Sequence, residues 1–217
     1  MRYAPAALEE LCRRYWFPVY AYIRRRGNGR AEAEDLTQSF FLRLIERQTL
    51  AGIRREGGRF RSFLLTATEN FLANDFDRRC AQKRGGGVPT LSLDAQDSEG
   101  PYAPEEPEAT TPAMLFEKRW AFTLLDLAME RLSRKMSDTG KGDVFAALRG
   151  HLLGDDASPA YAEVGRVLGM SEGAVKVAVH RLRARYGAEL REVVAETVTR
   201  PEEIDDELQY LIRIVRQ

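Results

Sequence analysis

The amino-acid sequence predicts an all-α protein, with two helical domains joined by a flexible acidic linker and a further helix at the C-terminus. Apolar residues recur at helical spacing in both halves of the chain, and no convincing alternating strand pattern occurs. A segment rich in Gly, Pro and acidic residues separates the two halves. The apolar share of 44% is enough for packed cores.

The expected division of the chain follows this change in composition. We expect domains at residues 1–84 and 113–197, a linker at 85–112 and a C-terminal extension at 198–217. The linker contains no Lys or Arg and cannot bury enough apolar surface to fold by itself. The formal net charge of +0 therefore hides a separation of charge, because the basic residues gather in the two domains.

The first domain opens with two predicted helices. The first carries apolar residues at helical spacing, namely Leu8, Leu11, Tyr15, Val19 and Tyr22. The second is predicted from about Ala31 to Arg47, after the turn at residues 27–29. Its phasing puts Ala33, Leu36, Phe40, Phe41 and Leu44 on one side and Asp35, Gln38, Ser39, Leu42 and Glu46 on another. An exposed leucine among polar and acidic side chains suits a protein partner, and a solvated polar face is the alternative.

A third helix is predicted from about Arg59, with its apolar side formed by Phe60, Phe63, Leu64, Ala67 and Phe71. Away from that side lies Asn70, with Asn74 near its flank, and basic residues including Arg78 and Arg79 follow. Amide side chains can pair with the edges of unstacked bases, and arginines can hold phosphates. The alternative is that the basic residues only complement the dipole at the end of the helix.

The second domain is expected to begin with a long helix, whose apolar stripe runs from Leu115 to Met136. Shorter helices are predicted near residues 141–152, 159–168 and 171–197. The last two are separated by a turn with Gly169, which suits a left-handed helix end, and Ser171, which suits an N-cap. Two short helices around such a turn form a helix-turn-helix.

The helix after this turn has an outward side that suits DNA. At 100° per residue, its side opposite the apolar face carries Gly173, Lys176, Val177, His180, Arg181 and Ala184. Lys and Arg reach guanine edges or phosphates, and Val contacts the methyl group of thymine. The alternative is an ordinary amphipathic helix with solvated arginines.

The C-terminal extension has an apolar stripe of Leu208, Leu211, Ile212 and Val215, preceded by acidic residues. We expect it to pack on the second domain and to mask that domain's basic surface. A helix that only stabilises the fold is the alternative.

Several kinds of site are not expected. Cys12 and Cys80 are far apart and near no other Cys or His cluster, which argues against a zinc site or a disulfide framework. His151 and His180 do not form a catalytic pair, and no Gly-rich phosphate loop occurs. We therefore expect no catalytic residue, no metal and no cofactor. No apolar run approaches about 18 residues and no signal peptide is evident, so we expect a cytoplasmic protein without membrane insertion.

Three motifs in order resemble the extracytoplasmic-function sigma factors, the small promoter-specificity subunits of bacterial RNA polymerase. The segment "AEDLTQSFFLRL" looks like the family's polymerase-binding helix. The segment "FRSFLLTATENFLANDFDRR" looks like its −10 helix, and "MSEGAVKVAVHRLRARY" looks like the second half of its −35 helix-turn-helix. The resemblance covers about residues 8–84 and 113–195.

The resemblance implies a role for each matching residue. Asp35, Gln38 and Leu42 would bind core RNA polymerase, although Ser39 stands where the family usually has Glu. The −10 element would be read by Asn70 and Asn74 together with the loop before Phe60, with Arg78 and Arg79 nearby. The −35 element would be read by Lys176, Val177, His180 and Arg181, with Gly173 allowing close approach.

The implied partners are core RNA polymerase and promoter DNA, with an anti-sigma protein or a Ser/Thr kinase as a candidate regulator. Thr37 is a poor phosphorylation site, because the phasing turns it toward the apolar side. Two other functions stay open. One is a stand-alone helix-turn-helix regulator, and the other is an interaction module that sequesters a partner.

Overall fold

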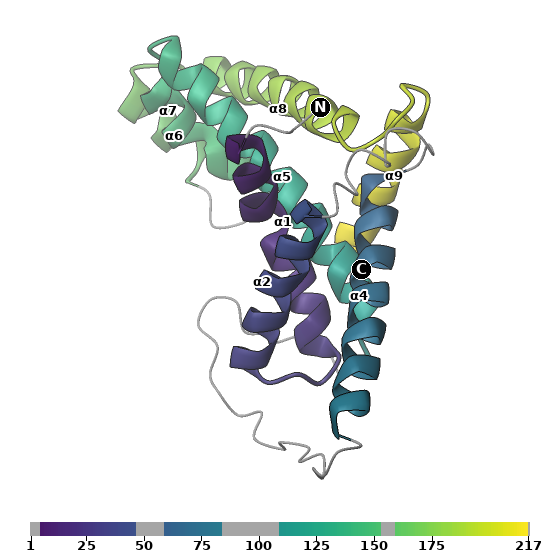
Figure 1. Ribbon diagram of the computed structural model, residues 1–217. Coiled ribbons are helices and arrows are strands. Elements are labelled where there is room, and N and C mark those ends of the chain that lie inside the picture. Colours follow the sequence, from purple (N-terminus) through teal and green to yellow (C-terminus); the bar gives the residue numbers. More distant parts are fainter. Residues whose placement is uncertain (1–4, 47–58, 84–108, 153–158, 217) are drawn as a thin grey trace. The chain divides into compact units, whose positions relative to one another are not determined.

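The computed structural model (Figure 1) describes residues 5–46, 59–83, 109–152 and 159–216. Within these ranges every element of regular structure is a helix, so the predicted all-α class is confirmed. Most of the expected linker lies outside the described residues. Its last residue, Pro112, begins a helix, where proline is suited because that position needs no backbone N–H.

The chain forms two compact units, each described here by itself. Unit 1 joins residues 1–123 to residues 197–217, and unit 2 consists of residues 124–196. This division differs from the expected one. The units divide inside one long helix and not in the acidic segment at residues 85–112.

In unit 1, α1 (Pro5–Arg25) and α2 (Arg30–Glu46) lie side by side (Figure 1). The chain reverses between them through Gly27, whose φ of 92° is left-handed and favours glycine. The side-chain amide of Asn28 donates a hydrogen bond of 2.8 Å to the carbonyl of Ile23. This bond satisfies one of the carbonyl groups that the end of a helix leaves without a partner.

A cluster of aromatic rings joins α1 to α4 (Phe60–Lys83) and to the first half of α5 (Pro112–Asp138). The fully buried Trp120 stacks on Tyr15 with ring centroids 4.6 Å apart, and it lies 5.8 Å from Phe60. Phe116 is also fully buried, with its ring 6.3 Å from that of Trp120. Burying a ring of this size stabilises a fold by about 1.5–3 kcal/mol. The start of α5 therefore belongs to unit 1.

Unit 2 contains the second half of α5, α6 (Gly142–Leu148), the 3-10 helix η1 (Arg149–Leu152), α7 (Tyr161–Leu168) and α8 (Glu172–Ala195). These helices are close to the predicted ones. They share one core of buried residues: Leu132, Met136, Phe145, Leu148, Val164, Val175, Val179 and Leu182.

The C-terminal helix α9 (Glu203–Val215) belongs to unit 1, so the expectation that it covers the second domain is wrong. Its buried residues Glu207 and Leu211 face into unit 1, where Glu207 forms an ion pair with Arg61 near the start of α4. The apolar stripe correctly indicated that this helix has a buried face. The stripe could not indicate what this face packs against, because that depends on Arg61, which is far away in the sequence.

We predict that Trp120→Ala lowers the free energy of unfolding of the chain by about 3–5 kcal/mol, the usual loss for a large buried aromatic residue. Urea unfolding followed by far-ultraviolet circular dichroism measures the loss. Phe122→Ala is the matched control on the same helix, because Phe122 is 37% exposed. It should cost about 1 kcal/mol or less. Equal losses for the two variants would contradict the placement of Trp120 in the core of unit 1.

Candidate nucleic-acid interface

The turn between α7 and α8 has the geometry that the sequence predicts. Gly169 ends α7 in the left-handed conformation, with φ 65° and ψ 31°. The N–H of Met170 then donates to the carbonyl of Gly165 at 2.8 Å. Ser171 caps α8, because its hydroxyl oxygen accepts a hydrogen bond of 3.2 Å from the N–H of Ala174. The helix-turn-helix is therefore present in unit 2.

Gly165 is a feature of this turn that the sequence analysis missed. It lies inside α7 and its φ is not left-handed, so the usual glycine signals do not apply. A Cβ atom added here would lie 2.5 Å from the carbonyl oxygen of Met170 and 3.6 Å from Cγ2 of Val175. The contact with a backbone oxygen leaves no room for any larger residue. Gly165 thus allows α7 and the turn to approach closely enough for the helix-turn-helix to form.

The outward face of α8 is exposed as its phasing predicts. Val175, Val179 and Leu182 are buried in the core of unit 2. All the candidate DNA-contacting residues of this helix are exposed, namely Gly173, Lys176, Val177, His180 and Arg181. Val177 is an exposed apolar side chain among these polar ones. A Cβ atom added to Gly173 would meet nothing within 4 Å, so glycine is not required there by the fold of the free chain.

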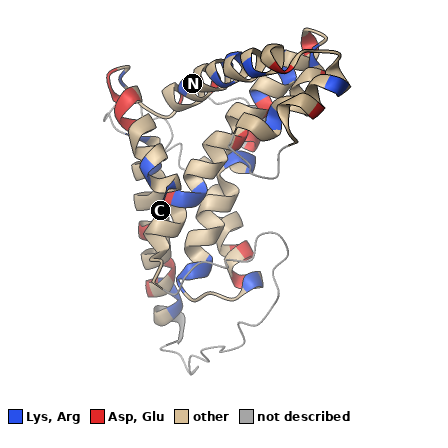
Figure 2. Ribbon diagram, turned by 180° about the vertical axis from the view of Figure 1, so that it is seen from behind, with Lys and Arg blue, Asp and Glu red and all other residues tan. Residues whose placement is uncertain are grey.

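Lys and Arg recur along α8 (Figure 2), but they do not all face solvent in the same way. The guanidinium group of Arg183 donates two hydrogen bonds, of 3.1 and 2.7 Å, to the carbonyl of His151. Nη1 of Arg185 lies 3.1 Å from the sulfur atom of Met136. Arg181, in contrast, has no hydrogen bond or ion pair within the described ranges, and its side chain is available to a ligand. Of these three arginines, Arg183 and Arg185 therefore contact other residues of unit 2, whereas Arg181 is available to a ligand.

Lys176 is held in a local ion pair. Its ammonium group lies 2.7 Å from Oε1 of Glu172, one helical turn earlier, and 6.0 Å from the ring centre of Tyr161. The hydrogen bond to Glu172 raises the pKa of Lys176, so the amine stays charged. Both partners are exposed to water, and such a pair contributes little to stability. A phosphate or a guanine edge can therefore replace Glu172 at small cost.

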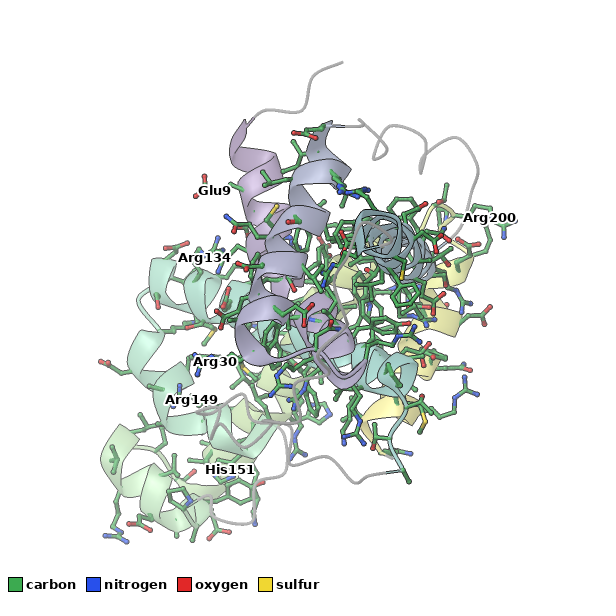
Figure 3. The ribbon with its side chains drawn as sticks, turned by 60° about the horizontal axis from the view of Figure 1, so that its bottom comes forward. Glu9, Arg30, Arg134, Arg149, His151 and Arg200 are labelled. Carbon is green, nitrogen blue, oxygen red and sulfur yellow. The ribbon has the colours of Figure 1, made fainter. Side chains whose placement is uncertain are left out.

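The two histidines occupy different environments. His180 is exposed on the outward face of α8. His151, labelled in Figure 3, is buried in unit 2, where its ring lies 4.8 Å from that of Tyr161. Its Nε2 atom is buried without a hydrogen-bond partner among the described residues. His151 is thus a core residue, and it does not share an exposed surface with His180.

The second helix, α2, presents the exposed face that the sequence predicts. Asp35 and Gln38 are exposed, and Leu42 keeps 54% of its surface accessible. Thr37 is fully buried and its hydroxyl donates a 2.6 Å hydrogen bond to the carbonyl of Ala33. A kinase could not reach Thr37 without unfolding this helix. This agrees with the prediction that Thr37 is a poor phosphorylation site.

The candidate −10 residues on α4 are not equivalent. Asn70, Asn74 and Arg78 are exposed, and the amide of Asn74 donates a 2.6 Å hydrogen bond to the carbonyl of Asn70. Arg79 forms ion pairs with Asp75, at 2.6 Å, and with Glu32 on α2. The hydrogen bond with Glu32 raises the pKa of Arg79.

Arg79 therefore already links α4 to α2, and a nucleic acid would have to compete with two carboxylates for it. The sequence analysis also missed Phe76, which is 67% exposed on the same helix. Its signal was present in the sequence, because phasing α4 on its apolar side leaves Phe76 outside that side.

No metal-binding cluster and no helix that could span a membrane occur within the described ranges.

The geometry defines a two-unit, all-α protein of the helix-turn-helix class. Residues 11–80 match the family Sigma-70 region 2. This match contains α2 and most of α1 and α4.

A comparison with curated proteins gives a relative whose name also refers to a sigma factor. The chain is 29% identical over 175 residues to the ECF RNA polymerase sigma factor BldN of Streptomyces coelicolor. The alignment covers 81% of this chain and 57% of that protein, so the chain spans less than two thirds of the relative's length. No solved structure matches the chain. The two matches support an extracytoplasmic-function sigma factor, the family that the motifs predict.

We predict that Gly165→Ala destabilises the chain by about 1–3 kcal/mol, because the added methyl group collides with a backbone oxygen. Thermal unfolding followed by circular dichroism measures this change. Gly173→Ala, at an open helical position, is the control and should stabilise by up to about 1 kcal/mol through helix propensity. If Gly165→Ala were as stable as Gly173→Ala, the close approach of α7 and the turn would be refuted.

Proposed function

We propose that the chain is a sigma factor that binds core RNA polymerase and directs promoter-specific transcription initiation. In this function unit 2 recognises the −35 element and unit 1 binds polymerase and recognises the −10 element. The observation that carries the proposal is the outward face of α8, which leaves Lys176, Val177, His180 and Arg181 exposed behind a well-formed helix-turn-helix turn. The family matches support the same function.

The −35 contacts follow from the chemistry of this face. Arg181 offers a planar group that donates two parallel hydrogen bonds to guanine N7 and O6. Lys176 offers a mobile charge for a phosphate or a guanine edge, and Val177 an apolar contact for a thymine methyl group. His180 adds a donor beside Arg181, and Gly173 lets the start of α8 come close to the duplex.

Polymerase docking is assigned to α2. Its exposed face combines the carboxylate of Asp35, the amide of Gln38 and the apolar surface of Leu42. This combination suits a basic partner surface with an apolar centre. Polymerase supplies the chemistry of transcription, so we assign no catalytic residue and no cofactor to this chain.

Recognition of the −10 element is assigned to α4. Asn70 and Asn74 present amides to the edges of unstacked bases, and Arg78 is an exposed cation for the phosphates. Arg79 contributes only if its ion pairs are exchanged. Because a sigma factor acts with polymerase, we place the chain in the cytoplasm. An anti-sigma protein that covers the exposed face of α2 would block docking.

We predict that a run-off transcription assay with core polymerase gives a start-site-specific product with the wild-type chain. Arg181→Ala should lower promoter affinity by about 1–3 kcal/mol, the value of one bidentate base contact. Arg134, which is exposed on α5 and labelled in Figure 3, supplies the control. Arg134→Ala removes an equal charge from unit 2 and should keep the sequence preference. Identical promoter profiles for the two variants would contradict base reading by α8.

We predict that Asp35→Ala weakens binding to core polymerase by about 1.5–3 kcal/mol, the usual contribution of a charged hydrogen bond. Its binding to −35 duplex DNA should stay unchanged. The control is Glu34→Ala, which removes a carboxylate one position away that pairs with Arg30. Co-sedimentation with core enzyme measures the difference.

The same experiments separate the alternatives. A stand-alone helix-turn-helix regulator would bind DNA without polymerase and would not respond to Asp35→Ala. A sequestering module would tolerate Arg181→Ala without any loss.

A further inference from the structure

The first turn of α4 is held by the C-terminal segment of the chain, within unit 1 (Figure 1). The backbone N–H of Phe60, the first residue of α4, donates a 2.9 Å hydrogen bond to the carbonyl of Thr197, which is 4% exposed. A helix leaves its first N–H groups without a partner inside the helix. A residue far away in the sequence thus supplies a cap that neighbouring residues usually supply.

α9 reaches the same turn with two acidic side chains. Oε1 of Glu207, which is buried, accepts a 3.1 Å hydrogen bond from Nε of Arg61. Oε2 of Glu207 forms an ion pair with Nε of Arg59 at 3.2 Å, and the carboxylate of Asp206 lies 4.0 Å from the same guanidinium group. The loop at residues 47–58 lies outside the described residues. Both arginines at the start of α4 are therefore engaged by α9.

α5 adds a third carboxylate to this network. Nη1 of Arg61 donates a 2.6 Å hydrogen bond to Glu117, and the guanidinium group lies 4.0 Å from the ring centre of Tyr210 on α9. Burial and a hydrogen bond to Glu117 raise the pKa of Tyr210 to about 12, so the phenol keeps its proton. The buried Arg61 is thus fixed by two helices at once.

The network is balanced in charge. Among the described residues it contains the two arginines of α4, three carboxylates, and Arg213 of α9, which lies 5.1 Å from the ring centre of Tyr210. No excess of positive charge is left to attract a nucleic acid. Breaking a buried ion pair by removing one partner is strongly destabilising, because it leaves an uncompensated charge. The network therefore suits the fixing of a geometry better than the binding of a ligand.

The first turn sets the position of the rest of α4 within unit 1. The ring of Phe60 lies 5.8 Å from that of Trp120, so the turn has an aromatic contact besides the polar network. Each residue of an α-helix follows the last by a fixed rise and rotation, so a shift at Arg61 is passed on to Asn70 and Asn74. Hydrogen bonds weaken steeply when their angle is poor, so such a shift costs these amides their contacts with base edges.

We propose that Glu207 is a positioning residue for −10 recognition: from α9 it fixes the first turn of α4, so that Asn70 and Asn74 present their amides in the register that a −10 sequence needs. The inference rests on the proposed function, which assigns −10 recognition to α4. Glu207 itself contacts no DNA. α9 lies outside the segment that matches Sigma-70 region 2, and it is thereby a part of promoter reading that this segment does not contain.

The test measures promoter opening by the full chain with core polymerase, on a promoter selected with the wild-type chain. 2-Aminopurine in the −10 element reports opening, because its fluorescence rises when the base unstacks. Each variant is measured on this promoter and on one with a single −10 substitution. A loss of folded protein lowers both signals in proportion and keeps their ratio, whereas a shift of α4 lowers the ratio itself.

Glu207→Gln keeps the size of the side chain and removes its charge. It should lower the ratio about tenfold, the value of one charge-assisted hydrogen bond. Binding to −35 duplex DNA and co-sedimentation with core polymerase should stay at their wild-type values. Glu203→Gln is the matched control on the same helix, because Glu203 pairs locally with Arg200 at 2.7 Å. It should keep the wild-type ratio.

A double-mutant cycle shows whether Glu207 acts through Arg61. In an Arg61→Gln background, Glu207→Gln should lower the ratio much less than in the wild-type chain, because the contact is already broken. Fully additive losses would overturn the proposal. Equal ratios for Glu207→Gln and Glu203→Gln would overturn it as well.

Glu207→Asp decides the matter if Glu207→Gln loses helix content by circular dichroism. It keeps the charge at a shorter reach and should lower the ratio by a smaller factor. An unchanged ratio for this variant would then refute the positioning role alone, provided that the wild-type chain opens the promoter. A wild-type chain that gives neither opening nor a run-off transcript would refute the proposed function, and this inference with it.

Discussion

The stacking of Trp120 on Tyr15 ties the start of α5 to α1 within unit 1. It places the first half of α5 in the same core as α1 and α4, although the acidic segment lies between them in the sequence. Because α5 is one continuous helix, the same element then continues into unit 2. The acidic segment at residues 85–112 therefore connects two parts of unit 1.

Cations held by nearby carboxylates are a recurring feature of the described residues. Lys176 is paired with Glu172, Arg79 with Glu32 and Asp75, and Arg61 with Glu117 and Glu207. A polyanion must exchange these internal partners, so its binding energy is reduced by their loss. Arg181 differs because it needs no exchange. In the proposed DNA complex, non-specific binding to phosphates is thereby weakened relative to a contact that also reads a base edge.

The sequence predicted the faces of the helices well, because burial on one side of a helix follows directly from a repeat of 3.6 residues. The buried side of α2, with Leu36 and Phe40, and that of α8, with Val175 and Val179, were both correct. The same repeat does not reveal what covers a buried face. The stripe of α5 from Leu115 to Met136 is continuous in the sequence, yet its two halves belong to different cores.

The features that the sequence analysis missed or predicted wrongly depend on contacts between residues that are distant in the sequence. Arg181 and Arg183 are the same residue type two positions apart, and only the carbonyl of His151 distinguishes them. The need for Gly165 depends on the path of the backbone at Met170, and the docking of α9 depends on Arg61. A single sequence carries no local signal for such contacts, because each is fixed by the tertiary structure.

The insertion of unit 2 between two segments of unit 1 has a consequence for protein engineering. A fragment cut after the acidic segment in order to isolate unit 2 would carry residues 113–123 with it and remove Phe116 and Trp120 from the core of unit 1. A functional chimera would instead need two junctions, one inside α5 and one next to Thr197.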